Sequence, residues 1–205
     1  MNILAHLYLS RTIDESMLGN FMGDFVKGNQ LNLFPESIRQ GIILHRQIDS
    51  ITDRHESHKQ SRDRFREKYR LHSGIVVDII YDHFLARYWE TYHHETLHDF
   101  AHQVYTYIKQ NDSLLPERLK EMTGFMIRNN WLELYKTAEG IERVLMGMAR
   151  RTSVPNEVAF AMTVLKKDYK ELNNEFEKVF TTLNDSLRSE SFQRAMVESN
   201  FDIQT

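Results

Sequence analysis

"IVVDIIYDHFLARYW", residues 75–89, decides the fold, because it is apolar on nearly every side of a helix. A helix at a protein surface shows one apolar stripe, whereas a helix that is apolar all round is covered by protein on most sides. The stretch therefore predicts a central helix over residues 74–92. Asp82 and His83 lie on neighbouring flanks of this helix, where little solvent is available to them.

The rest of the chain also has helical periodicity. Only three prolines and eight glycines occur in 205 residues, which is few for a β-rich protein, and no strand alternation, internal repeat or linker is found. We expect an all-α, single-domain helical bundle over residues 1–205, with a metal site in 1–90 and C-terminal helices (155–200) packed on it. The predicted helices span 13–27, 35–53, 55–70, 74–92, 94–110, 116–129, 137–150, 155–182 and 186–197.

Composition narrows the class of protein. The net charge of -3 and pI of about 6.4 do not favour nucleic acid as a partner. No stretch approaches the roughly 18 apolar residues of a membrane span, and the first ten residues lack the features of a signal peptide. Cysteine is absent, which excludes disulfides and thiolate metal sites. We expect a cytoplasmic protein that binds neither nucleic acid nor membrane.

Several polar residues stand where apolar ones are expected. In "GIILHRQIDSITD", residues 41–53, His45 and Asp49 share a helix face with isoleucines. A lone buried histidine usually bonds a backbone carbonyl, and a lone aspartate at a helix start is usually a cap. Six such groups on four amphipathic segments are harder to explain separately, because burying each unpaired charge costs several kcal/mol or more. The six are His6, Asp24, His45, Asp49, Asp82 and His83.

A shared divalent cation would satisfy several of these groups at once. Aspartate and histidine without cysteine suit Mn²⁺, Mg²⁺, Fe or Zn²⁺, and the spacing does not choose among them. Such an ion typically lowers the pKa of a bound water toward ~7. This chemistry favours hydrolysis, and hydrolysis of a phosphoester fits best. Arg46, next to His45, is placed to bind a phosphoryl oxygen.

"KQSRDRFREKYR", residues 59–70, is basic, with six basic residues against two acidic ones. Its ordinary interpretation is a solvated helix face with charge pairs between successive turns. The alternative is a docking surface for an acidic partner.

"HETLH", residues 94–98, matches the H-E-x-x-H signature of zinc proteases. Ala101 stands where the extended signature of one large protease group has glycine, and the flanking pattern predicts a polar helix edge. His94 and His98 would then lie beside the apolar face rather than in a cleft. A protease is therefore the disfavoured interpretation.

Six blocks of this sequence resemble the acyl carrier protein phosphodiesterase family, also called holo-acyl-carrier-protein hydrolases. The resemblance runs through most of the first 150 residues. It implies an all-α fold distantly related to HD-domain metal phosphohydrolases, although here Asp82 precedes His83, the reverse of the usual HD order. It also implies Mn²⁺ or a similar ion, and hydrolysis of the phosphodiester joining 4'-phosphopantetheine to a serine of acyl carrier protein. The blocks are "NILAHLYLS", "GNFMGDFVKG", "GIILHRQIDSITD", "YDHFLARYW", "NNWLELY" and "VLMGMARR".

The resemblance also assigns roles by position. Arg46 would face the phosphoryl oxygens, and His83 or His6 would give the serine leaving group a proton. Because acyl carrier protein is strongly acidic, the basic segment gains a role in docking it. The implied metal ligands are Asp24, His45, Asp49, Asp82 and His83. The implied docking residues are Arg62, Arg64, Arg66, Arg70, Arg150 and Arg151.

Two alternatives stay open at the level of sequence. One is a phosphohydrolase of the same fold that acts on a nucleotide. The other is a non-enzymatic helical module that binds acyl carrier protein through its basic face, its buried polar groups merely hydrogen-bonded. Metal analysis separates module from enzyme, and a panel of substrates separates the two enzymes.

Overall fold

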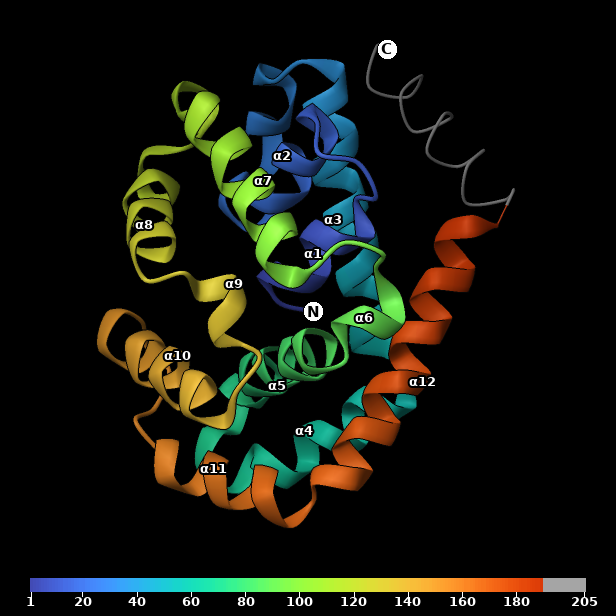
Figure 1. The fold of residues 1–205 in the computed structure, drawn as a ribbon, viewed down its shortest axis with the longest axis vertical. Helices are drawn as coiled ribbons and strands as arrows, with labels where there is room; N and C mark the ends of the chain where they lie inside the picture. The colour runs from blue at the N-terminus through green and yellow to red at the C-terminus, as the bar shows by residue number, and fades with distance from the viewer. Residues whose placement is uncertain (190–205) are drawn as a thin grey trace.

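A computed structural model describes residues 1–189, which fold into a single helical domain with no strand in that range (Figure 1). Helix α5 (Ser73–Arg87) crosses the middle of the molecule, and 11 of its 15 residues are buried. Helices from both halves of the chain pack on it, including α1, α4, α10 and α12. The all-α prediction and the central helix are confirmed. None of the helices in residues 1–189 is long and apolar enough to cross a membrane.

The other helices follow the predicted order, with most ends within a few residues of prediction. The remaining α-helices are α1 (Ile3–Leu9), α2 (Glu15–Met22), α3 (Glu36–Arg54), α4 (Glu56–Tyr69), α6 (Trp89–Tyr92), α7 (Leu97–Gln110), α8 (Glu117–Arg128), α9 (Trp131–Leu134), α10 (Ala138–Arg151), α11 (Val158–Lys167) and α12 (Tyr169–Arg188). The 3₁₀ turns are η1 (Gly23–Phe25), η2 (Gly28–Leu33), η3 (Arg70–His72) and η4 (Asp112–Leu114). The predicted helix 186–197 extends beyond the described residues.

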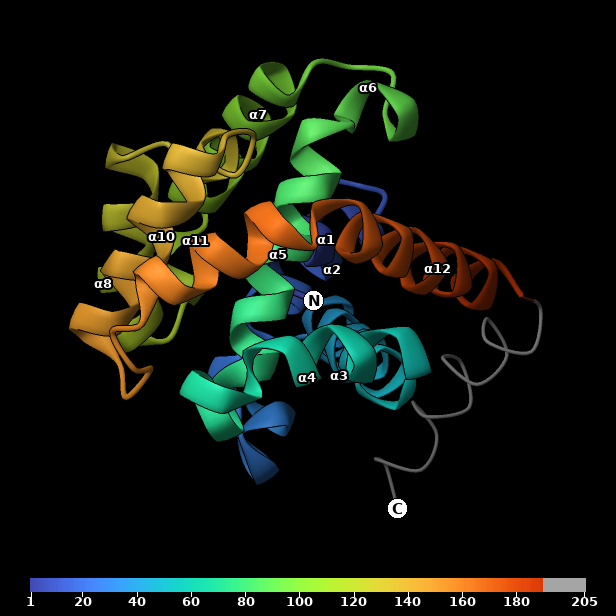
Figure 2. The same ribbon diagram turned by 90° about the horizontal axis from the view of Figure 1, so that it is seen from below.

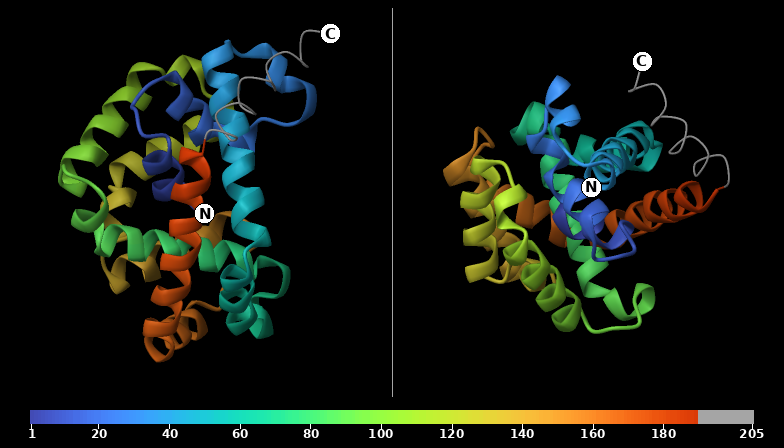
Figure 3. Two further views of the ribbon diagram at one scale, coloured as in Figure 1. Left: turned by 90° about the vertical axis from the view of Figure 1, so that its right-hand side faces the viewer. Right: turned by 90° about the horizontal axis from the view of Figure 1, so that it is seen from above.

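The helix predicted over 155–182 is in fact two helices, α11 and α12, which meet at Asp168. The carboxylate of Asp168 lies 3.5 Å from Arg64 Nε of α4. Arg64 also makes a two-pronged ion pair with Glu175 of α12, with N–O distances of 2.7 and 2.8 Å. One arginine thus binds the bend and the helix that follows it. In Figures 2 and 3, α12 runs on past α4 and along α3.

Helix α1 was not predicted, because seven residues are too few to show a period. Its start is held by side-chain acceptors for three backbone N–H groups, which a helix cannot satisfy internally. Asn2 accepts from Ile3, and Asp82 of α5 accepts from Leu4 at 2.8 Å and from Ala5 at 3.1 Å. Asp82 therefore positions α1 on the central helix.

Helices α2 and α3 pack at unusually close range through two glycines. A Cβ on Gly19 would lie 2.0 Å from the carbonyl oxygen of Ile38, and one on Gly41 would lie 1.9 Å from that of Ser16. No side chain fits at either position. This contact packs α2 against the N-terminal third of α3.

We predict that Gly41→Ala lowers the free energy of unfolding by about 1–3 kcal/mol, because the added methyl group forces the two backbones apart. Chemical denaturation measures the change. The matched control is Gly124→Ala in α8, where the new Cβ would meet only the flexible end of Arg128 at 3.3 Å. That substitution should be neutral or stabilise by up to about 1 kcal/mol. Equal effects of the two substitutions would contradict the packing described for α2 and α3.

Candidate metal centre

Two imidazoles and a carboxylate meet where α1 crosses α3. His6 Nε2 lies 3.1 Å from Asp49 Oδ1, and His45 Nε2 lies 3.1 Å from Asp49 Oδ2. The two rings are stacked, with centroids 4.1 Å apart. One ligand atom from each residue lies within 4.8 Å of the others, so a single cation can touch all three. His45 and Asp49 were expected together as neighbours one turn apart, and His6 joins them as a third ligand candidate.

Asn20 of α2 sets the direction of both rings. Its side-chain amide donates to the His6 carbonyl and to Ser10, so its Oδ1 is the acceptor for His6 Nδ1, at 2.8 Å. Its backbone carbonyl accepts from His45 Nδ1, also at 2.8 Å. Both Nδ1 atoms therefore carry hydrogen, and both Nε2 atoms face Asp49; His6 Nε2 also lies 3.2 Å from the carbonyl oxygen of Met1. Such partners fix the tautomer and orientation of metal-binding histidines.

We predict that Asn20→Ala weakens binding of a divalent cation by about 10- to 100-fold, the usual effect of losing a group that orients ligands. Titration of metal-free protein with Mn²⁺ in a calorimeter measures the affinity. Ser10→Ala is the control, since it removes the other partner of the Asn20 amide and leaves both ring contacts in place. A cation affinity in Asn20→Ala equal to that of Ser10→Ala would contradict the role given to Asn20.

Asp24 lies at the rim of the cluster. Its carboxylate is 79% exposed, and its Oδ1 is 3.4 Å from His45 Nε2. η1 brings Asp24 beside the ring because Gly23 leaves room: a Cβ there would lie 2.2 Å from His45 Cγ. Burial by itself lowers the pKa of His45, but the nearby carboxylates of Asp24 and Asp49 outweigh burial and raise this pKa to about 9. In the metal-free protein, His45 is therefore protonated, and its positive charge lies between the carboxylates of Asp24 and Asp49.

This proton makes the stability of the metal-free protein depend on pH. The folded pKa of His45, about 9, lies above the ordinary histidine pKa of 6.5. The stabilisation is therefore complete below pH 6.5 and is lost as the pH rises through 9, by up to about 3 kcal/mol. We predict that the free energy of unfolding of wild type, relative to that of His45→Gln, falls as the pH rises from 6.5 to 9. Urea unfolding in a chelator measures it, and a constant difference between the two proteins would contradict the charge pairing.

Beside the cluster lie a third imidazole and a further carboxylate, those of His58 and Asp78. The α-ammonium of Met1 lies 3.2 Å from Asp78 Oδ1 and 3.7 Å from Asp49 Oδ1. His58 Nε2 contacts the same oxygen of Asp78 at 3.1 Å. Burial lowers the pKa of the Met1 amine, but the two carboxylates outweigh burial and raise it. These partners could not be predicted from the sequence, because no spacing links Met1 or His58 to the recognised blocks.

Three predicted site residues lie in other contacts. The Asp82 carboxylate holds the start of α1, and burial raises its pKa to about 7. His83 Nδ1 donates to the carbonyl of Tyr135 at 2.7 Å, and its Nε2 lies 3.0 Å from the Tyr169 hydroxyl. Arg46 donates from Nη2 to the carbonyl of Val26, just after η1. The structure does not bring Asp82 and His83 into the cluster with His45.

The predicted docking arginines differ in their surroundings. Arg64 forms ion pairs with Glu175 of α12 and with Asp168 at the bend before α12. Arg62 Nη1 lies 3.9 Å from Asp53 Oδ1. Arg66 and Arg70 are exposed on and after α4. Arg150 is exposed near the end of α10, and the Arg151 guanidinium lies 3.6 Å from the centre of the Phe125 ring.

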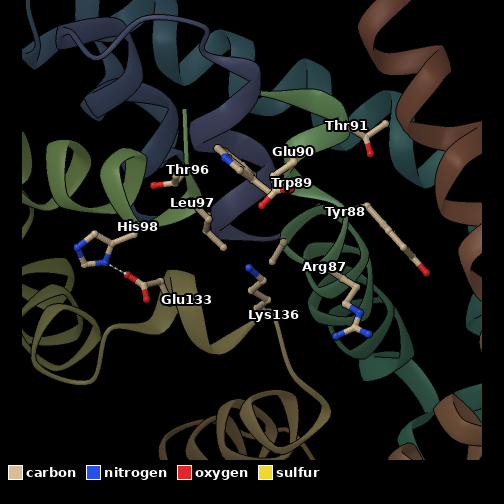
Figure 4. A pocket seen from close by; sticks show the side chains of 11 residues that line it. Arg87, Tyr88, Trp89, Glu90, Thr91, Thr96, Leu97, His98, Glu133 and Lys136 are labelled. Atoms are coloured by element: carbon tan, nitrogen blue, oxygen red, sulfur yellow. Dashed lines mark hydrogen bonds and ion pairs between the residues drawn. The ribbon is translucent and has the colours of Figure 1, made fainter. Parts of the chain in front are cut away.

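The H-E-x-x-H stretch does not form a metal site. Its first residues lie in a turn, because α7 begins only at Leu97. The two histidines are therefore not one turn apart on a helix; His94 is 85% exposed, and His98 Nδ1 donates to Glu133 at 2.7 Å. Figure 4 shows this pair at the edge of a cavity of about 400 Å³, with Lys136 and Arg87 on other sides. Among residues 1–189, three or more potential ligands come together only at His6, His45 and Asp49.

Comparison with known proteins connects this chain to one family. A family model described as "Acyl carrier protein phosphodiesterase" matches residues 1–183. A protein named acyl carrier protein phosphodiesterase from Yersinia pestis is 35% identical over 89% of this chain and 95% of its own length. One of the same name from Photorhabdus laumondii subsp. laumondii is 34% identical over 94% of this chain and 98% of its own length. No solved structure matches the chain.

Proposed function

The chain belongs to the acyl carrier protein phosphodiesterase family, and we propose that it hydrolyses the bond joining 4'-phosphopantetheine to a serine of holo-acyl carrier protein. The products would be apo-acyl carrier protein and phosphopantetheine. One observation supports the proposed site: His6, His45 and Asp49 converge beside an open cavity. The relatives are named acyl carrier protein phosphodiesterases. These names favour holo-acyl carrier protein over a nucleotide as the substrate, and they favour an enzyme over a non-enzymatic binding module.

We propose that a divalent cation, Mn²⁺ by preference, binds these three residues, with Mg²⁺, Fe or Zn²⁺ as other candidates. The donors fit such an ion: two neutral imidazole nitrogens and a carboxylate suit it without a thiolate. His45 Nε2 is also a buried nitrogen without a well-aligned hydrogen bond. A cation bound here would supply Lewis-acid polarisation of the phosphoryl group and activation of water.

Each residue of the cluster has a distinct task in this proposal. Burial lowers the pKa of His6, which favours the neutral ring that a cation needs. Asn20 keeps both rings aimed at the ion. Asp24, exposed at the rim, is the proposed base: its carboxylate can accept a proton from the attacking water. Arg46 ties down the chain after η1 and so positions Asp24.

Docking of the acidic carrier is assigned to the exposed arginines, Arg66, Arg70, Arg150 and Arg151, since Arg64 is occupied inside the protein. Charges at the edge of an interface mainly affect the rate of encounter and its salt dependence. We also propose a cytoplasmic location, which the cysteine-free composition favours.

We predict that His45→Ala and Asp49→Ala each lower hydrolysis of holo-acyl carrier protein by at least about 100-fold, because each removes one of three ligands. Purified protein is incubated with Mn²⁺ and the carrier, and mass spectrometry measures loss of the phosphopantetheine group. Glu95→Gln is the control, since it removes the only base of the H-E-x-x-H stretch and leaves the cluster untouched. Full activity in both cluster variants, or its loss in Glu95→Gln, would overturn the assignment.

A further inference from the structure

The proposed reaction fixes what must lie on each side of the cluster. The reacting phosphorus is bonded through oxygen to a serine of the carrier and to the pantetheine arm. If phosphorus sits beside His6 and His45, the carrier must contact the rim of the site. The pantetheine arm must then extend from the phosphorus in another direction, into a cavity beside the rings of His6 and His45.

One cavity meets this requirement. A cavity of about 220 Å³ begins at His6, His45 and Asp24 and extends between α2 and the later helices α8 to α10. Its wall away from the cluster is mostly apolar, with Trp131 and Val144 buried and Met122 and Met148 half-buried.

The cavity continues beyond these residues. A second hollow, of about 290 Å³, is lined by four of the same residues: Phe25, Met122, Trp131 and Thr152. Its other walls carry Phe125, with the Arg151 guanidinium over the ring, and the charged residues Arg118 and Glu121. An extended ligand can therefore run from the cluster, past apolar walls, toward charged groups near the end of α10.

We propose that this apolar groove binds the pantetheine arm of the substrate, and that Trp131, Val144 and Met148 are residues that select for it. The inference rests on the proposed function. The arm is an uncharged chain with a dimethyl branch, two amides and a thiol, so apolar walls with few polar groups suit it. Polar atoms at the inner end are the Asn2 amide and the Tyr135 hydroxyl, 3.4 Å apart, which can bond an amide of the arm.

Binding measurements test the groove independently of turnover. Each buried methylene strengthens binding by about fourfold, so 4'-phosphopantetheine should bind the Mn²⁺-loaded protein at least about tenfold more tightly than glycerol 3-phosphate does. Val144→Phe fills the groove from within, and Met148→Trp narrows it from the half-buried side. Each should reduce the ratio of the two affinities to about one and leave the affinity for glycerol 3-phosphate unchanged. Calorimetry measures both ligands.

Val164→Phe in α11 is the matched control, because it adds the same bulk at a half-buried valine that lines neither cavity. It should keep the wild-type ratio. A wild-type ratio near one, or unchanged ratios in both groove variants, would overturn the inference. If Val144→Phe does not fold, as judged by circular dichroism, Met148→Trp decides.

The same proteins separate this inference from the proposed function. Wild type that shows the predicted ratio and does not cleave holo-acyl carrier protein would support the groove and contradict the proposed function. Wild type that cleaves the carrier and binds both ligands equally would contradict the groove alone.

Discussion

The geometry of the site depends on Asn20. Its side-chain carbonyl bonds His6 and its backbone carbonyl bonds His45, which fixes the orientation of both rings. An imidazole can ligate a cation only through a nitrogen that is free of hydrogen and correctly aimed. Asn20 is fully buried, and its amide is bonded on the donor side, so it cannot turn to offer anything else. Two rings from different helices thus share one orienting residue.

Asn20 can orient both rings only if α1, α2 and α3 keep their relative positions. The glycine contact of α2 with α3 sets the distance between Asn20 and His45. The hydrogen bonds from the start of α1 to Asp82 set the position of His6. A buried carboxylate on the central helix is costly without partners, so the helix start and the carboxylate satisfy each other. Asp82, which does not contact the two rings directly, therefore supports the cluster through the backbone of α1.

The sequence predicted the helices and part of the site for the same reason, periodicity. His45 and Asp49 are one turn apart, so their shared face needed no knowledge of the rest of the fold. Asp82 and His83 are adjacent on a helix, about 100° apart around its axis. Which neighbours they meet depends on tertiary packing, which put Asp82 under α1 and His83 against Tyr135 and Tyr169. The sequence of its own helix suggests that Arg64 is exposed. Its partner, Glu175, lies 111 residues later in the chain and meets it only because α12 packs on α4. Kinship to HD-domain hydrolases stays a prediction from the resemblance.

We propose that one cation binds where His6, His45 and Asp49 converge. Crystals of the protein grown with Mn²⁺ and measured at the manganese absorption edge would locate the ion directly through its anomalous signal. We predict one strong peak in contact with both Nε2 atoms and a carboxylate oxygen of Asp49, with Asp24 near enough to share the ion's water. A fully occupied peak elsewhere, or no peak between these residues at a concentration that supports hydrolysis, would contradict the account.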